Sequence, residues 1–382
     1  MRVPIQRSLI DWAIARARLD PDEVTLKYTW LGSSGADATV EPTIKQLEKF
    51  AATAHVPMGF LFLSDPPREE VPIPDFRTMG SSKGVGPSPN LLDTIYMAQN
   101  RQDWYRTYMV SNDLDPPKFV GSTTAESDTV EVARQISEVL RFNLEDRAAT
   151  KTWADALSKL VEQTDDTGVL VMINGVVGNN THRKLDPEEF RGFALFDAVA
   201  PLIFVNGADT KSAQMFTIVH ELAHIWAGKS ALTDSTPEDV PSDELERWCD
   251  KVAAEVLVPI ANLQTKLKPN EDTHETLIRL AREYKVSTLV ILRRLFDVGQ
   301  FRPAEFGNLY EQELARLKKV MAASGAGGNF YNTQNFRVSR RFARALLEST
   351  FSGRTLYGDA LRLMSVSNVK TLKETARRLE VV

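Results

Sequence analysis

The sequence predicts an α+β fold that is mostly helical and contains a small β-sheet. Residues 90–163 show helical periodicity, including 90–110 and 126–140. The apolar run Gly168–Asn174 begins the strands. Residues Met215–Trp226 are apolar nearly all round, which is typical of a helix inside a domain, where polar side chains need partners.

Four segments are predicted along the chain. Residues 1–65 form a helical domain, and residues 66–89 form a linker, because Pro, Gly and Ser are too frequent there for packed elements. Residues 90–300 form the central α+β domain, and residues 301–382 form a basic helical C-terminal domain. The helices predicted in the first segment cover residues 9–18, 21–28 and 43–54.

The motif His-Glu-Leu-Ala-His at residues 220–224 is the main functional signal. Residues i and i+4 of an α-helix share a face, so His220 and His224 can bind one metal ion while Glu221 lies beside the water that the metal activates. The chain has 5 histidines in 382 residues, and a chance match has a probability on the order of half a percent. The motif predicts zinc-dependent hydrolysis with Glu221 as the general base.

A catalytic zinc ion needs a third protein ligand and one open position, so a further ligand is expected downstream on another element. The segment Ser242–Pro259 is predicted to be a helix, capped by its first residue and ended by its last. Glu246 is the predicted ligand, and Asp250 is predicted to accept the other N–H of a ligand histidine. Glu244 is the weaker candidate, because it lacks such a partner. Alone, this pair would indicate a solvated helix face; the upstream motif favours the metal.

At these residues the sequence resembles the ImmA/IrrE family of zinc metallo-endopeptidases, in which a HExxH helix is followed by a Glu-bearing helix that ends in Ala-Ala-x-x-Leu-x-Pro. The matching end here is Ala253–Pro259. Phe190–Asp197 and Pro201–Asn206 look like the strand pair that precedes the active helix in that family, whereas Trp248–Asp250 stands where many members carry Glu-Ala-Asn. The resemblance covers about residues 150–300. It implies a zincin-like peptidase domain, Zn²⁺ as cofactor, and a regulatory protein such as an Xre-type repressor as substrate.

The N-terminal helices resemble an Xre-type helix-turn-helix domain, which often precedes a peptidase of this family. No Arg or Lys occurs at residues 31–39, where a recognition helix is expected, and residues 1–66 hold 7 basic and 8 acidic side chains. Because DNA binding requires a basic surface, a scaffold or protein-contact role is favoured. A second helix-turn-helix rhythm at residues 280–295, with Ser287 as N-cap, is also interpreted as scaffold.

Several further residues are candidates for the site. Tyr284 is a candidate donor to the oxyanion that develops during peptide hydrolysis; His274 and His182 are weaker candidates, because a lone histidine is more often a surface or core residue. The strand Gly192–Asp197 is interpreted either as a place where an extended substrate adds to the sheet or as an ordinary core edge. Cys249 is interpreted as a small buried hydrophobe rather than as a nucleophile.

The composition bounds the class of protein. With 43% hydrophobic and 25% charged residues, 382 residues suffice for two or three domains. The single cysteine rules out a disulfide framework, and the sequence has neither a charged-then-apolar leader nor a run of about 18 apolar residues. A cytoplasmic enzyme that does not enter the membrane is expected. The net charge of -5 excludes a uniformly basic nucleic-acid binder.

The C-terminal region is basic, with 13 Lys and Arg against 6 Asp and Glu in residues 311–382. Helical spacing of Arg337, Arg340, Arg341 and Arg344 predicts one face that carries four guanidinium groups. Such a face can contact phosphates or an acidic partner. The alternative is a solvated face that pairs with nearby acids.

Three functions are compatible with these features. The leading hypothesis is a zinc-dependent endopeptidase that cleaves a specific regulatory protein in a stress or mobile-element response. The second is a transcriptional regulator or antitoxin-like protein with an idle metal site, which binds DNA or protein through the arginine face. The third, a general degradative protease, ranks last because flanking helical modules indicate a dedicated partner.

Overall fold

The structure, a computed structural model, describes residues 1–32, 39–69, 71–73, 86–233, 244–323 and 337–381. Its contacts divide the chain into two compact units, Met1–Tyr96 and Met97–Val382. Helix α4 (Pro89–Ser111) contains the boundary between the units. Much of the predicted linker, residues 70 and 74–85, lies outside the described residues. The four-segment division therefore stays a prediction.

The first unit is helical and contains a short antiparallel ribbon. Its elements before α4 are β1 (Ile5–Gln6), α1 (Arg7–Arg16), α2 (Pro21–Lys27), the 3-10 turn η1 (Thr29–Leu31), β2 (Thr39–Val40), α3 (Ile44–Ala54) and the 3-10 turn η2 (Met58–Phe62). Asp20 caps α2, and Thr43 forms a capping box with Gln46 at the start of α3. The three predicted helices are confirmed. Residues 33–38, where a recognition helix was expected, are not described, so the helix-turn-helix resemblance stays a prediction.

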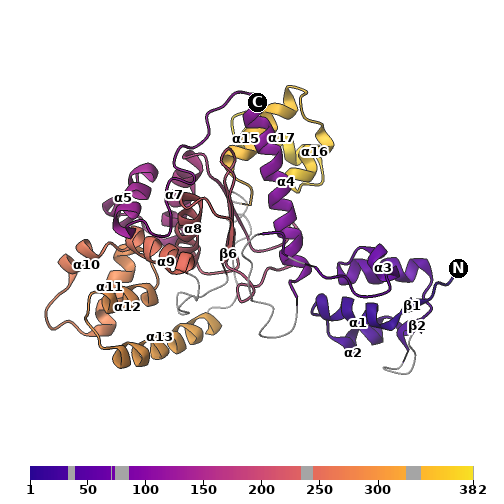
Figure 1. The fold of residues 1–382 in the computed structure, drawn as a ribbon, viewed down its shortest axis with the longest axis horizontal. Helices are drawn as coiled ribbons and strands as arrows, with labels where there is room; N and C mark the ends of the chain where they lie inside the picture. Colours follow the sequence, from indigo (N-terminus) through magenta and orange to yellow (C-terminus); the bar gives the residue numbers. More distant parts are fainter. Residues whose placement is uncertain (33–38, 70, 74–85, 234–243, 324–336, 382) are drawn as a thin grey trace. The chain divides into compact units, whose positions relative to one another are not determined.

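The second unit is α+β and mostly helical, which confirms the predicted fold class (Figure 1). Its further helices are α5 (Thr129–Leu140), α6 (Leu144–Ala148), α7 (Trp153–Asp166), α8 (Lys211–Trp226), α9 (Glu244–Leu257), α10 (Ile260–Lys266), α11 (Thr273–Tyr284), α12 (Thr288–Asp297), α13 (Pro303–Ala323), α15 (Arg340–Phe351), α16 (Tyr357–Met364) and α17 (Val369–Arg378). Its strands are β3 (Leu170–Asn174), β4 (Gly192–Leu195), β5 (Leu202–Asn206) and β6 (Ala231–Thr233). Ser287 caps α12, as predicted, by accepting a hydrogen bond from the backbone N–H of Val290.

The four strands pair in the order β3-β5-β4-β6. β5 runs parallel to β3 and antiparallel to β4, and β6 pairs antiparallel with the other side of β4. The expectation that Gly192–Asp197 offers an edge is therefore wrong, because β4 has a hydrogen-bonded neighbour on each side. The order of strands depends on pairing between distant segments, which the local pattern of one strand does not contain.

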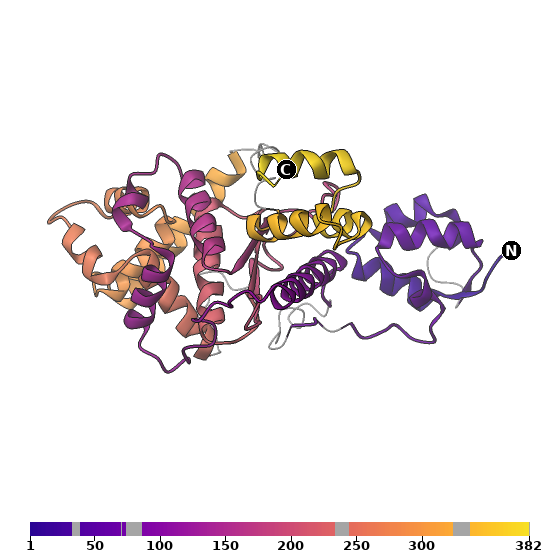
Figure 2. The same cartoon turned by 90° about the horizontal axis from the view of Figure 1, so that it is seen from above.

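The two faces of the sheet are covered by different helices (Figures 1 and 2). Val171, Ala194 and Ile203 point to one face and share a hydrophobic core with α7 and α8. On the opposite face, the rings of Phe193 and Phe204 stack with centroids 5.1 Å apart. The sheet therefore backs the helix that carries the candidate metal ligands.

Helices α15–α17 pack beside the part of α4 that belongs to the second unit (Figure 2). The ring of Trp104 on α4 meets Phe342 on α15 edge to face, with centroids 5.5 Å apart. The carboxylate of Asp165, at the end of α7, accepts hydrogen bonds from the Ser339 hydroxyl and, at 2.8 Å, from the backbone N–H of Arg341. Asp165 thereby adds a cap to the N-terminus of α15 and joins α15 to α7 within the second unit. In the described part of the chain, no helix has the length and apolar character needed to cross a membrane.

Candidate metal centre

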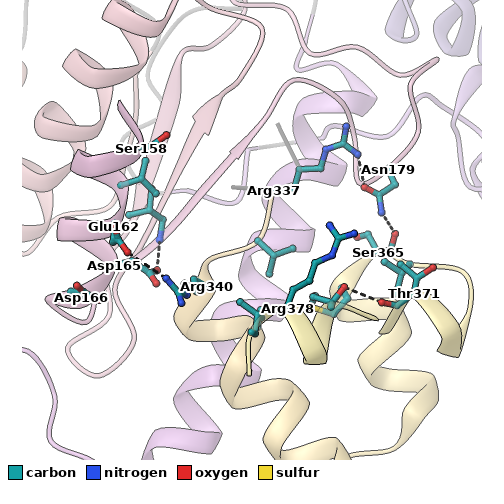
Figure 3. Close-up of a pocket in the computed structure, with 18 of the residues that line it drawn as sticks. Ser158, Glu162, Asp165, Asp166, Asn179, Arg337, Arg340, Ser365, Thr371 and Arg378 are labelled. Carbon is teal, nitrogen blue, oxygen red and sulfur yellow. Dashed lines mark hydrogen bonds and ion pairs between the residues drawn. The ribbon is translucent and has the colours of Figure 1, made fainter. Parts of the chain in front are cut away.

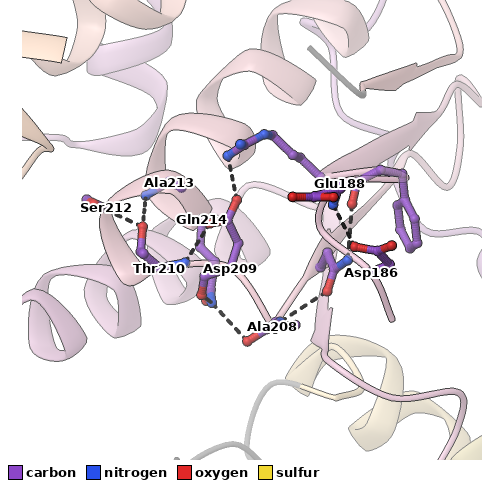
Figure 4. Close-up of polar contacts among 12 residues, drawn as sticks. Asp186, Glu188, Ala208, Asp209, Thr210, Ser212, Ala213 and Gln214 are labelled. Atoms are coloured by element: carbon purple, nitrogen blue, oxygen red, sulfur yellow. Dashed lines mark hydrogen bonds and ion pairs between the residues drawn. The ribbon is translucent and has the colours of Figure 1, made fainter. Parts of the chain in front are cut away.

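Helix α8 carries the HExxH motif and begins at an anchored turn (Figure 4). The hydroxyl of Thr210 caps the helix by accepting a hydrogen bond from the backbone N–H of Ala213, at 3.3 Å. The side-chain amide of Gln214 donates to the carbonyl oxygen of Asp209, at 2.6 Å. These bonds satisfy polar groups in the turn between β5 and α8 and fix where the helix starts.

The candidate functional residues of α8 are buried. His220, Glu221 and His224 are each 0% exposed, and their neighbours along the helix are mostly buried apolar residues. Burying imidazole and carboxylate groups in such surroundings is costly unless partners compensate for the lost hydration. Three such groups within five residues therefore require a compensating partner, and a bound cation is one.

Helix α9 packs beside α8 and presents two carboxylates to it. Glu246 and Asp250 lie one turn apart, with side chains 24% and 25% exposed. The predicted cap, Ser242, lies outside the described residues. Trp248 anchors the same helix, because its indole N–H donates to the carbonyl oxygen of Ser127 at 2.8 Å. The packing thus directs the two carboxylates of α9 to the histidine face of α8.

His220, His224 and Glu246 converge on one point, because their ligand atoms all lie within 4.8 Å of one another, close enough to hold one metal ion. The two Nε2 atoms are 3.1 Å apart, and they lie 3.1 Å and 3.2 Å from different carboxylate oxygens of Glu246. Zinc bonds of about 2.0–2.1 Å at a tetrahedral angle put neighbouring ligand atoms about 3.3 Å apart. Two imidazoles and a carboxylate at these distances fit Zn²⁺ in both chemistry and spacing.

Asp250 orients one of the two histidines. Its Oδ1 lies 2.9 Å from Nδ1 of His220. A carboxylate at this position accepts a hydrogen bond from the Nδ1–H of His220. The proton then stays on Nδ1, and the lone pair of Nε2 is available to a metal. In the described residues, Nδ1 of His224 has no hydrogen-bond partner. The two histidines are thus held differently, although they come from the same motif.

The electrostatics of the cluster favour positive charge. Burial lowers the pKa of His220, but hydrogen bonds and charge from Asp250 and Glu246 outweigh burial and hold that pKa well above its ordinary value. Burial raises the pKa of Glu246, whereas its hydrogen bonds to His220 and His224 lower the pKa and prevail. A site that attracts a proton this strongly also attracts a divalent cation, which would displace that proton on binding.

Gly192 contributes to the site in a way that the sequence analysis missed. A Cβ at this position would lie 2.5 Å from Cγ2 of Thr217, 2.8 Å from the carbonyl oxygen of Phe204, and 3.4 Å from Oε1 of Glu221. Only glycine therefore lets β4 approach α8 this closely beside Glu221. The signal in the sequence was a glycine at the start of a strand of large apolar residues.

The other candidate residues lie outside the group formed by His220, His224 and Glu246. Tyr284 is buried, and its hydroxyl donates to Oδ1 of Asn262 at 2.5 Å, so its role as oxyanion donor stays a prediction. His274 and His182 are exposed on a helix start and in a loop. Cys249 is 0% exposed in the apolar core, in agreement with its interpretation as a buried hydrophobe.

The arginine face is only partly a helical face. Helix α15 begins at Arg340 after the N-cap Ser339, so Arg337 precedes the helix, and the expectation of four arginines on one helical face is wrong for it. A hydroxyl side chain favours the cap position, and the helix starts there rather than earlier. Arg340 pairs with Glu162 at 3.3 Å, and Nε of Arg341 donates to the carbonyl oxygen of Asp165 at 2.9 Å. Arg340 and Arg341 thus bind groups of the same chain. Arg344 lies partly buried on the same helix.

Comparison with known families gives two matches. Residues 164–296 match the family model Peptidase_M78, described as an IrrE N-terminal-like domain. Residues 338–378 match the model of a domain of unknown function, DUF8813. No curated protein matches the chain. The first match contains His220, His224 and Glu246, supports the ImmA/IrrE resemblance, and supports a peptidase of the metal-dependent type.

Proposed function

We propose that the chain is a zinc-dependent endopeptidase that cleaves a specific regulatory protein, of the Xre-type repressor kind, in the cytoplasm during a stress or mobile-element response. The observation that carries the proposal is the convergence of His220, His224 and Glu246 within hydrogen-bond distance of one another. Zinc held there would supply a Lewis acid that activates water and polarises the peptide carbonyl.

The protein residues around the cation have distinct roles in this proposal. Glu221 is adjacent to His220 on α8 and buried, so its carboxylate can take a proton from the attacking water and return it to the leaving amine. Asp250 holds the Nδ1 proton of His220, which keeps the imidazole in the tautomer that binds the cation through Nε2. Gly192 keeps β4 close to Glu221 and helps to restrict solvent there.

An extended substrate has a place to add to the sheet. Among the strands that the structure describes, β6 pairs only with β4. The register puts Thr233 of β6 opposite Gly192, the residue beside Glu221. A substrate strand added to β6 would therefore run near the metal site, with backbone hydrogen bonds giving affinity and side-chain pockets giving specificity.

The competing functions have less support. A DNA-binding regulator with an idle metal site needs basic groups that are available to phosphates, yet Arg340 and Arg341 contact groups of their own chain. A general degradative protease would not need the additional helical domains that flank the peptidase domain. The N-terminal unit is more consistent with a protein-contact module that selects the substrate.

The test is cleavage of an Xre-type repressor, encoded beside the gene, by the purified full chain with its zinc content measured in the same sample. We expect about one zinc per chain and a single cleavage site in the repressor. Casein and an unrelated folded protein serve as controls. Stoichiometric zinc without cleavage of the repressor would remove the proposed substrate, and digestion of all three proteins would favour the degradative protease.

A further inference from the structure

A cavity lies between α7 and the helices α15–α17, apart from the candidate metal centre (Figure 3). Its volume is about 880 Å³, which is within the range of small-molecule sites. One wall is α7, whose residues Ser158 and Glu162 face it, and the opposite wall is α17, through Thr371, Thr375 and Arg378. The residues Leu372 and Ala376 of α17 are buried, so the helix packs with one face and presents a polar face to the cavity.

Charge is distributed unevenly around this cavity. Among the described residues, the carboxylates that line the cavity come from α7, and two of them are engaged, because Glu162 pairs with Arg340 and Asp165 caps α15. The wall away from α7 carries Arg337 and Arg378, which Figure 3 places on the side of Asn179 and Ser365. Glu374 pairs with Nε of Arg378 at 3.3 Å but does not line the cavity. Among the described residues that line it, this wall therefore carries guanidinium groups and no carboxylate.

A fully buried arginine behind that wall adds to its positive charge. Arg101 is 5% exposed and donates to the carbonyl oxygen of Leu363 at 2.8 Å, to Oγ of Ser365 at 3.0 Å and to Sδ of Met172 at 3.5 Å. Among the described residues, none of its partners is a carboxylate. Burial lowers the pKa of Arg101 to about 10, so the group stays charged at neutral pH.

The two buried arginines are linked through the cavity wall. Nη1 of Arg337 donates to Oδ1 of Asn179 at 2.7 Å, and the amide of Asn179 donates to the backbone oxygen of Ser365. Ser365 in turn accepts the hydrogen bond from Arg101, which leaves its hydroxyl proton for a further acceptor. The wall thus combines the guanidinium groups of Arg337 and Arg378 with the hydroxyl of Ser365, and both kinds of donor favour an anion.

We propose that this cavity is a binding site for a small organic anion, a molecule with one phosphate or carboxylate group and a compact apolar body. The anionic group contacts Arg337, Arg378 and the hydroxyl of Ser365. The apolar body packs against Val161, Val171 and Met364. Such a ligand holds α7 and α17 together, and α7 also packs against the HExxH helix. The proposal does not depend on the peptidase function.

Isothermal titration calorimetry of the full chain tests this proposal with three probes, which are phenyl phosphate, phenylacetate and the neutral benzyl alcohol. We expect at least one of the two anions to bind with a dissociation constant at or below about 1 mM, and benzyl alcohol to give no saturable heat. The stronger of the two anions identifies the acidic group of the natural ligand. Bound anion also raises the melting temperature.

Matched variants locate the binding. Arg378→Gln is expected to weaken binding about fivefold and Arg337→Gln about tenfold, whereas Arg377→Gln, one residue earlier and outside the cavity, is expected to have no effect. Glu246→Ala, which removes a metal ligand, leaves anion binding intact. If Arg337→Gln does not fold, Ser365→Ala replaces it. The proposal is overturned if neither anion binds, if benzyl alcohol binds equally well, or if Glu246→Ala abolishes binding while Arg378→Gln does not weaken it.

Discussion

Two clusters of this protein share the same helical spacing and differ in what surrounds them. His220 and His224, one turn apart on α8, are fully buried and face a carboxylate at about hydrogen-bond distance. Arg340 and Arg344, one turn apart on α15, lie near the surface, and Arg340 pairs with Glu162. Spacing therefore identifies residues that share a face, whereas burial and the chemistry of the facing atoms decide whether the face is a site.

The largest effect is expected from removing a ligand of the buried cluster. Glu246→Ala takes away one of three ligands, and zinc content should fall from about one to less than about 0.1 per chain, with cleavage lost. Metal analysis by mass spectrometry measures the change. Glu244→Ala, two residues earlier on the same helix and exposed, is the matched control and should keep its zinc. Equal zinc content in the two variants would show that Glu246 is not a ligand.

The next largest effect separates chemistry from metal binding. Glu221→Gln keeps the shape of the side chain but cannot take a proton, so kcat should fall about 10²–10⁴-fold while zinc stays bound. The measurements are kcat for cleavage of the repressor and the zinc content of the variant. Retained cleavage would refute the role of Glu221 as base, and loss of zinc would show that the residue acts instead on the metal.

A smaller effect is expected at Asp250, which contacts the candidate ligand His220 but is not itself a proposed ligand. Asp250→Ala removes the acceptor of the His220 Nδ1 proton, which lies 2.9 Å away, and should weaken zinc affinity about 10–100-fold without abolishing it. Competition with a fluorescent chelator measures the affinity. Asp250→Asn, which still accepts a hydrogen bond through its side-chain oxygen, should lose less zinc affinity than Asp250→Ala. An unchanged affinity in the alanine variant would place Asp250 outside the site.

The arginine cluster should give the smallest effect. Arg340 is 58% exposed and its partner Glu162 is 61% exposed, so Arg340→Gln should change the free energy of unfolding by no more than about 0.5 kcal/mol. Urea denaturation measures this change. A loss of several kcal/mol would mean that the Arg340–Glu162 pair is structural. Exposure would then not separate this pair from the buried histidine cluster.

Local pattern was sufficient to place the candidate ligands on shared helix faces. The i, i+4 spacing placed His220 and His224 together, and a helix start followed by Glu246 and Asp250 placed two carboxylates one turn apart. Each of these inferences depends on helical geometry alone, which the sequence specifies well. The bound cation, the roles of these residues and the substrate stay predictions.

Features that depend on pairing between distant segments were not predictable in the same way. The interior position of β4 follows from β6, which returns to the sheet after α8. The role of Gly192 appears only once β4 lies against Thr217. The start of α15 is set partly by Asp165, which is 176 residues away from Arg341 in the chain. A periodicity argument considers one element at a time and contains none of these contacts.

The proposed peptidase activity depends on one cation held by two imidazoles and one carboxylate. X-ray absorption at the zinc edge of the purified full chain tests this most directly. We predict one zinc per chain, with a first shell of nitrogen and oxygen at about 2.0–2.1 Å and the outer-shell scattering of two imidazoles. A sulfur neighbour at about 2.3 Å, a shell of six oxygens, or a signal without histidine scattering would contradict the proposed centre.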